Sequence, residues 1–143
     1  MPVVDASVVV DWVAPGAADE LPAQRLLRRW IATGETVQGP RLLVAEVYNA
    51  LLTGVRRRRW SAADSDTAAA LMAKAPIGLP DDDREIVRAW ELARQYDNWP
   101  IYDMIYVALA ERLGTSLVTA DQRLADRLSH LDWVLSPNDV LGA

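Results

Sequence analysis

The chain contains no cysteine and only one histidine among its 143 residues. Without cysteine, neither a disulfide nor a thiolate metal site can form. The single histidine, His130, is too few for a histidine-based catalytic triad or dyad, or for a histidine-rich metal site. Catalysis or metal binding by this chain would therefore depend on other side chains, and its 20 acidic residues are the main candidates.

The chain also lacks a surplus of positive charge, because its formal net charge is −5 and its pI is about 4.8. Proteins that bind nucleic acid through non-specific electrostatics are usually basic. The charge balance therefore argues against a simple electrostatic RNA-binding module. It argues less against a metal-dependent nuclease, because bound cations would offset a local acidic cluster.

Long hydrophobic runs are absent as well. No segment approaches the roughly 18 consecutive apolar residues of a membrane span. The N-terminus begins with an apolar, strand-like run instead of the basic segment of a signal peptide. We therefore expect a cytoplasmic protein with no membrane association. A chain of 143 residues has room for one domain, which we expect to cover residues 1–143.

The distribution of apolar residues predicts short strands that alternate with helices. Strands are expected at residues 2–5, 36–38, 76–79, 116–119 and 133–135, and helices at 8–13, 20–33, 40–58, 61–74, 82–97, 101–113 and 122–128. Ser7 is expected to cap the first of these helices. The alternation is typical of an α/β protein with a parallel sheet and helices on both faces. Ligand sites in such folds form at the carboxyl ends of the strands.

Two acidic residues interrupt segments that otherwise suit the core. Asp5 lies within Val-Val-Asp-Ala-Ser-Val-Val-Val, and a buried carboxylate must be neutralised, paired or bound to a metal. Glu46 falls inside the apolar arc of its helix, between Leu42 and Ala50. The alternatives are an N-cap role for Asp5 and a solvated position for Glu46.

Asp103 and Asp121 carry weaker local signals. Asp103 lies early in the 101–113 helix, where an acid in the first turn needs no special purpose. Asp121 follows Leu-Val-Thr-Ala and could simply cap the helix that begins at Gln122. Together with Asp5 and Glu46, however, these residues place acids at strand ends and helix starts, which a parallel sheet would bring to one edge.

The four acids together predict a metal site. Oxygen ligands suit Mg²⁺ or Mn²⁺ and do not suit zinc. Several carboxylates cannot all stay charged without cations, because like charges raise each other's pKa values. We therefore predict that Asp5, Glu46, Asp103 and Asp121 are candidate catalytic residues that hold one or two divalent cations.

At these positions the sequence resembles the PIN-domain ribonucleases, and specifically the VapC-type toxins of bacterial or archaeal toxin–antitoxin pairs. The matching segments are Val-Val-Asp5-Ala-Ser, Pro40-Arg-Leu-Leu-Val-Ala-Glu46-Val-Tyr-Asn-Ala-Leu, Ile101-Tyr-Asp103-Met-Ile-Tyr-Val-Ala-Leu-Ala-Glu and Leu117-Val-Thr-Ala-Asp121-Gln-Arg-Leu. The resemblance covers essentially the whole chain. One departure is Met104, where the family often has a small residue.

The resemblance implies a single PIN domain with three layers and a five-stranded parallel sheet of order 3-2-1-4-5. It also implies endoribonuclease activity, inhibition by a cognate VapB-like antitoxin, and a homodimer. By motif position, Asp5 and Asp103 would be the main ligands of Mg²⁺ or Mn²⁺, and Glu46 and Asp121 would complete the site. Thr119 and Ser7 could orient a ligand or a water.

One dense basic cluster is present, composed of Arg56, Arg57, Arg58 and Arg59. It could contact RNA phosphates or an antitoxin. The alternative is a solvated helix end, where cations suit the helix dipole.

The tryptophans divide by their position in the expected helices. Trp30 and Trp90 fall on apolar helix faces, which predicts core packing. Trp12 and Trp60 are better candidates for an exposed groove, dimer or antitoxin surface.

Three rival functions can be compared with these residues. A phosphoacceptor receiver domain would need adjacent acids after the first strand and a lysine after the last, but Ala6 and Ser7 follow Asp5 and the only lysine is Lys74. A non-catalytic PIN-like RNA-binding or interaction protein should have lost one or more acids, and all four are retained. A PIN nuclease that acts in RNA processing remains an alternative.

Overall fold

The computed structural model describes residues 1–80 and 83–143 of the chain. Within these residues a five-stranded parallel sheet has the order β3-β2-β1-β4-β5. Its strands are β1 (Val3–Val4), β2 (Val37–Gln38), β3 (Ile77–Gly78), β4 (Leu117–Val118) and β5 (Val134–Leu135). The predicted α/β class, the strand positions and the order 3-2-1-4-5 are confirmed.

Helices connect the strands and follow the last one. They are α1 (Ala6–Val13), α2 (Pro22–Thr33), α3 (Leu42–Arg56), α4 (Ala62–Met72), α5 (Glu85–Gln95), α6 (Ile101–Leu113), α7 (Gln122–Arg127) and α8 (Pro137–Gly142). Residue 82, where the 82–97 helix was expected to begin, lies outside the described residues. In the part of the chain that the structure describes, no helix is long and apolar enough to cross a membrane.

Helix α8 was not predicted, although its sequence carries a start signal. The hydroxyl of Ser136 accepts from the backbone N–H of Asp139, whose carboxylate accepts in turn from the backbone of Ser136. Pro137 occupies the first turn, where its missing N–H is not needed. The reciprocal cap and the proline together fix this short helix beside β5.

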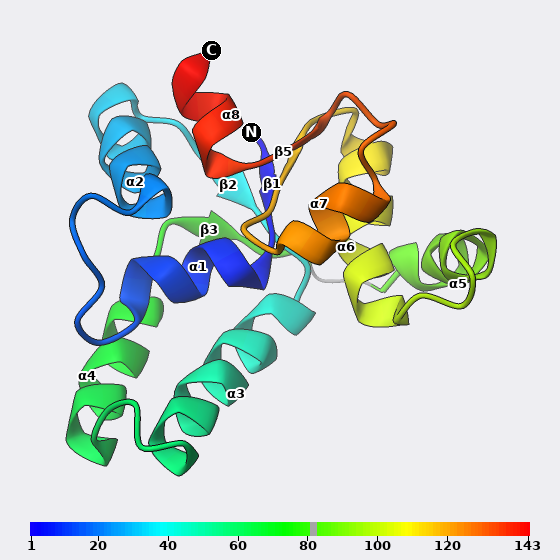
Figure 1. Ribbon diagram of the computed structural model, residues 1–143. Helices are drawn as coiled ribbons and strands as arrows, with labels where there is room; N and C mark the ends of the chain where they lie inside the picture. Colours follow the sequence, from blue (N-terminus) through cyan, green and yellow to red (C-terminus); the bar gives the residue numbers. More distant parts are fainter. Residues whose placement is uncertain (81–82) are drawn as a thin grey trace.

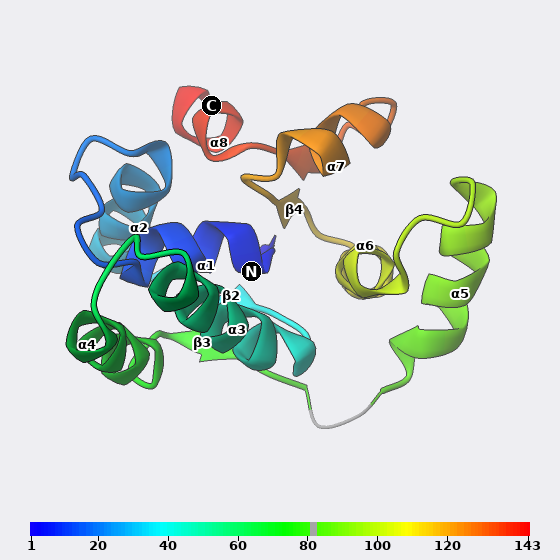
Figure 2. The same cartoon turned by 60° about the horizontal axis from the view of Figure 1, so that its bottom comes forward.

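The sheet lies between two groups of helices. Figure 2 shows α1 and α2 on one side, and α6 backed by α5 on the other, which gives the three layers expected. Helices α3 and α4 form a pair that projects from the body of the molecule, at the bottom of Figure 1. The carboxyl ends of the central strands β1 and β4 lead directly into α1 and the turn before α7.

The core forms where the sheet meets α6. Val3, Val4, Leu117 and Val118 of the two central strands are fully buried. Helix α6 is apolar around most of its circumference, and six consecutive or near-consecutive residues between Met104 and Ala110 are buried. A helix of this kind must be enclosed on several sides, and the sheet and α5 enclose it. The packing of α6 therefore sets the position of Asp103 in its first turn.

The tryptophan predictions are corrected in two places. Trp12 is buried, its indole donates to the backbone oxygen of Ala23, and its ring meets that of Trp30 edge-on at 6.1 Å. Trp90 is 62% exposed and does not pack in the core. The face of α5 that packs on α6 carries Ala89 instead, and the next residue of a helix points about 100° away. Trp30 is buried, as expected.

Trp60 is half-buried instead of forming an open surface. Its indole donates to the backbone oxygen of Leu51 at 3.0 Å, and its ring lies over Gly54. A Cβ atom at Gly54 would come within 2.0 Å of that ring. Gly54 is therefore required because any larger residue would clash with the Trp60 ring packed against α3.

Candidate active site at the carboxyl edge of the sheet

Asp5 stands at the end of β1, in the centre of the sheet. Its backbone N–H donates to the oxygen of Val118, which continues the β1–β4 pairing. The side chain is 6% exposed, and its Oδ2 accepts from Ser7 Oγ at 2.6 Å and from Thr119 Oγ1 at 2.9 Å. Asp5 occupies the N-cap position of α1, but its carboxylate is held by two hydroxyls from different segments. Capping alone does not explain this arrangement.

Ser7 and Thr119 join Asp5 to the turn that carries Asp121. Ser7 Oγ accepts from the backbone N–H of Ala120 at 2.9 Å, and Thr119 Oγ1 accepts from that of Asp121 at 3.0 Å. The expectation that Ser7 caps the first helix is wrong, because Ser7 lies inside α1. Both hydroxyls instead fix the orientation of the Asp5 carboxylate.

Glu46 lies in the second turn of α3, facing α6. Its Oε1 accepts from the hydroxyl of Tyr106 at 2.6 Å. Tyr106 is fully buried, and burial together with the nearby Glu46 carboxylate raises the pKa of its hydroxyl far above the usual range. The tyrosine therefore stays protonated and donates to Glu46. The sequence alone did not identify Tyr106 as the partner of Glu46.

Asp103 lies in the first turn of α6, as predicted. Its Oδ2 accepts from the indole N–H of Trp99 at 2.7 Å. The guanidinium of Arg123 lies 5.9 Å from the centre of the Trp99 ring. The contact of Trp99 with Asp103 was not predicted; the spacing of four residues between them is the only sequence signal that could have indicated it.

Asp121 is the N-cap of α7, and its Oδ1 accepts from the backbone N–H groups of Arg123 at 3.0 Å and Leu124 at 3.4 Å. The capping role left open by the sequence is therefore present. Asp121 also acts on the other acids, since its charge raises the pKa values of Asp5 and Asp103. The two roles use the same carboxylate.

The four acids, here called the carboxylate cluster (Asp5, Glu46, Asp103 and Asp121), are electrostatically coupled. Burial raises the pKa of Asp5, the hydroxyls of Ser7 and Thr119 oppose this, and Asp121 adds to it. Burial likewise raises the pKa of Glu46 and that of Asp103, and Asp5 raises both further. Segments that are far apart in the sequence are thus brought together at one edge of the sheet.

The donor set of the carboxylate cluster can be tested against a divalent cation. Among residues 1–80 and 83–143, no three Asp, Glu or His side chains are arranged to hold one metal ion together. Mg²⁺, however, usually keeps several waters and binds through one or two carboxylates. The carboxylate oxygens and the mutual repulsion of the cluster fit such a hydrated ion. The predicted four-acid metal site itself remains a prediction.

The arginine cluster (Arg56, Arg57, Arg58 and Arg59) lies away from the carboxylate cluster. All four side chains are exposed at the end of α3 and in the following turn. Ten residues of helix separate Glu46 from Arg56, which is about 15 Å along the axis. Arg59 lies over the Trp60 ring at 5.3 Å. Contact of this cluster with RNA or with an antitoxin remains a prediction.

The parallel sheet with the carboxylate cluster at its carboxyl edge is the arrangement that the sequence resemblance implied, and comparison with known families agrees. The PIN domain family model matches residues 3–130. The chain therefore belongs to the PIN-domain family, and its relatives place it in the VapC group. Ribonuclease VapC1 of Mycobacterium tuberculosis (strain H37Rv) is 36% identical over 127 residues, which is 86% of this chain and 87% of that protein. Ribonuclease VapC12 of the same strain is 34% identical over 137 residues, covering 91% and 94%.

Solved structures show the same fold. The crystal structure of PAE2754 from Pyrobaculum aerophilum has a TM-score of 0.68 and 23% identity, covering 98% of this chain and 85% of that one. The crystal structure of VapC20 from M. tuberculosis, described as a sarcin-ricin loop cleaving toxin, has a TM-score of 0.66 and 20% identity, covering 94% and 97%. The predicted resemblance and fold are confirmed.

Proposed function

We propose that this chain is a metal-dependent endoribonuclease toxin that hydrolyses RNA phosphodiesters. The observation that carries the proposal is the meeting of Asp5, Glu46, Asp103 and Asp121 at the carboxyl edge of the sheet, with raised pKa values at the first three. The relatives VapC1 and VapC12 are named ribonucleases, and this chain matches them over most of their length, which supports the same activity.

In this proposal Asp5 and Asp103 would be the main ligands of Mg²⁺ or Mn²⁺, and Glu46 and Asp121 would complete the site. The bound metal would supply a water of lowered pKa and positive charge against the phosphate oxygens.

The chain's own side chains would hold these ligands in place. Ser7 and Thr119 orient the Asp5 carboxylate, Tyr106 donates to Glu46, and Trp99 donates to Asp103. Such supporting bonds limit the rotation of each ligand.

We also propose a VapB-like antitoxin as partner, a homodimer and a cytoplasmic location. The proposal of a protein interface has one structural support, an exposed apolar face on α5. Ile86 is 45% exposed, Val87 67% and Trp90 62%. Contiguous exposed apolar side chains of this size mark protein contacts more often than isolated ones do.

The test is cleavage of total cellular RNA by the purified protein in Mg²⁺, Mn²⁺ or EDTA. We expect cleavage with either metal, none in EDTA, and none with Asp5→Asn, since the amide keeps the shape but removes the anionic ligand. Asp19→Asn, at an exposed position before α2, is the matched control and should cleave as wild type does. Full activity of Asp5→Asn would refute the assignment, and RNA binding without any cleavage would favour a non-catalytic PIN-like protein. Sequencing the fragment ends would identify the cut site.

A further inference from the structure

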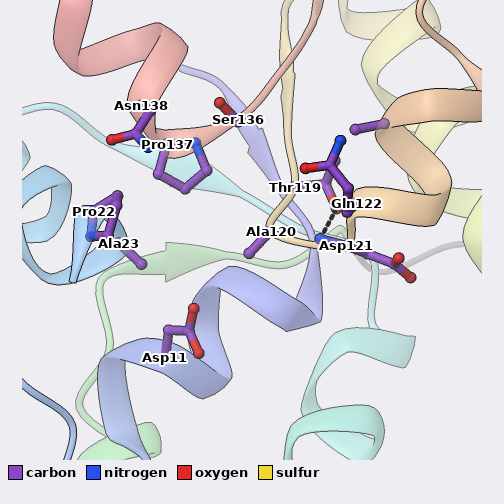
Figure 3. Close-up of a pocket in the computed structure, with 11 residues that line it drawn as sticks. Asp11, Pro22, Ala23, Thr119, Ala120, Asp121, Gln122, Ser136, Pro137 and Asn138 are labelled. Carbon is purple, nitrogen blue, oxygen red and sulfur yellow. Dashed lines mark hydrogen bonds between the residues drawn. The ribbon is translucent and has the colours of Figure 1, made fainter.

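A cavity of about 230 Å³ opens beside the carboxylate cluster, between α1, α2, α7 and the start of α8 (Figure 3). Thr119 and Asp121 belong to its lining as well as to the site described above. An occupant of this cavity would therefore lie directly next to the proposed cleavage site. The cavity is smaller than the roughly 300 Å³ at the low end for drug-sized ligands.

The walls of the cavity suit a flat ring. Pro22, Ala23, Ala120 and Pro137 contribute small or flat apolar surfaces, and Figure 3 shows them around the opening. Polar groups lie at the edges of the same space. Unpaired bases of RNA are recognised by this combination, with apolar contact to the face of the ring and hydrogen bonds to its Watson–Crick edge.

Asp11 supplies the polar group that points into the cavity. Its carboxylate rises from α1 toward Ala23 and Ala120 in Figure 3. The residue is half-buried, burial raises the pKa of its carboxyl, and no described residue donates a hydrogen bond to it. The Asp11 oxygens are therefore free to accept hydrogen bonds from a ligand that enters the cavity and brings donors.

The position of Asp11 relates this ligand to the site. Asp11 follows Ser7 by four residues, so both lie on one face of α1 about one turn, or roughly 5.4 Å, apart. Ser7 donates to Asp5. A group that reaches Asp11 is therefore about one helical turn from the Ser7–Asp5 contact, where the proposed metal would hold a phosphate, and this is the spacing of neighbouring parts of one nucleotide chain.

We propose that this cavity receives one unpaired guanine of the substrate RNA and that Asp11 accepts hydrogen bonds from its N1–H and N2 amine. Guanine alone places two donors side by side on its Watson–Crick edge. Adenine, cytosine and uracil place an acceptor beside the donor, which would face the second carboxylate oxygen. The inference rests on the proposed ribonuclease function and adds the base that the site selects.

The first experiment measures binding without cleavage. The Asp103→Asn protein in EDTA is titrated with a labelled uridine oligonucleotide that carries a single guanosine, or inosine in its place. Inosine lacks only the N2 amine. We expect the guanosine oligonucleotide to bind about tenfold more tightly. The difference should vanish in Asp103→Asn combined with Asp11→Asn, and should persist in Asp103→Asn combined with Asp19→Asn.

The second experiment sequences the fragment ends from total RNA. Wild type should show guanine enriched at one fixed position near the cut, and Asp11→Asn should lose that enrichment. Equal binding of guanosine and inosine oligonucleotides by the Asp103→Asn protein, or the same enrichment in Asp11→Asn, would overturn the inference. Failure of wild type to cleave any RNA would instead count against the proposed function, and the binding experiment would still test the cavity.

Discussion

Two buried carboxylates in this chain are held in opposite ways. Glu85, at the start of α5, is 5% exposed and pairs with the guanidinium of Arg112 on α6. Asp5, at the end of β1, is 6% exposed and is held by two hydroxyls. Glu85 has a cation beside it, whereas Asp5 has other carboxylates, whose charges raise the pKa values of the group.

The difference separates a structural region from a functional one. At the α5–α6 contact a second pair, Arg88 with Glu111 at 2.8 Å, repeats the arrangement of Glu85 and Arg112. A buried charge that is paired with an opposite charge in the same chain requires no counterion from solution. Asp5 and Glu46 have neutral donors and further acids as neighbours and therefore lack a compensating positive charge. Arg123 partly offsets the charge of Asp121 and Asp103. The burial of an acid therefore says less about its role than the charge of its neighbours.

The largest effect is expected on the rate of RNA cleavage, when a variant of the carboxylate cluster is compared with a variant of the α5–α6 contact. Asp103→Asn should lower RNA cleavage by more than about a hundredfold, since even residues that only support metal ligands contribute 10–100-fold. Glu85→Gln should leave the rate near that of wild type, because Arg112, its partner, lies roughly 13.5 Å from Asp103 along α6. Initial rates on one RNA at saturating Mg²⁺ measure both. A comparable loss in the two variants would remove the functional distinction between the regions.

The next largest effect is expected on Mg²⁺ affinity, when one of the hydroxyls that donate to Asp5 is removed. Thr119→Val removes the donor to Asp5 and the acceptor for the backbone of Asp121. We expect an apparent Mg²⁺ affinity about tenfold lower, from the dependence of the cleavage rate on Mg²⁺ concentration. Thr119→Ser keeps the hydroxyl and should restore most of the affinity. If serine behaves as valine does, packing of the methyl group, and not the hydroxyl, matters at this position.

Stability should change in opposite directions in the two regions. Glu85→Gln leaves Arg112 without its charge partner and should lower the free energy of unfolding by roughly 1–2 kcal/mol, because the arginine is partly exposed. Asp103→Asn should raise it at neutral pH in the absence of metal. Burial and the charges of Asp5 and Asp121 raise the pKa of Asp103 in the folded state above its usual value of 3.8.

The sign of this effect gives a pH test of the Asp103→Asn variant. When folding raises the pKa of a carboxyl, the protein loses stability as the pH rises from the pKa of the unfolded state to that of the folded state. The advantage of Asp103→Asn should therefore be present at neutral pH and disappear as the pH falls toward 3.8. Urea denaturation across this range measures it. An advantage that does not shrink in acid would mean that the repulsion in the cluster is weak.

The smallest effect is expected at the arginine cluster, whose charges face solvent. Arg57→Glu should weaken RNA binding by at most about threefold at physiological salt if the cluster contacts a single phosphate. Arg25→Glu, at an exposed position on α2, is the control. Affinity measured over a salt series separates the outcomes. No change relative to Arg25→Glu assigns the cluster to a solvated helix end.

The fold could be predicted because its signals are local. The five strands are short apolar segments, and helices between successive strands leave parallel pairing as the solution. Asp5 and Glu46 could be selected because they interrupt apolar segments, whereas Asp103 and Asp121 could be selected only together with them, from their shared placement at strand ends and helix starts and from the family resemblance. The expected exposure of Trp12 and burial of Trp90 were wrong, because helix periodicity identifies apolar residues but not the neighbour that each helix chooses.

By itself the sequence determined which residues are acidic, where the five strands and every helix but α8 lie, and that no disulfide, thiolate site or histidine triad can form. Only the tertiary structure decided what each acid contacts: Tyr106 for Glu46, Trp99 for Asp103, and the hydroxyls of Ser7 and Thr119 for Asp5. The physical reason is that propensity and periodicity act over a few residues, whereas hydrogen bonds and charge coupling in the cluster join side chains as many as 114 positions apart.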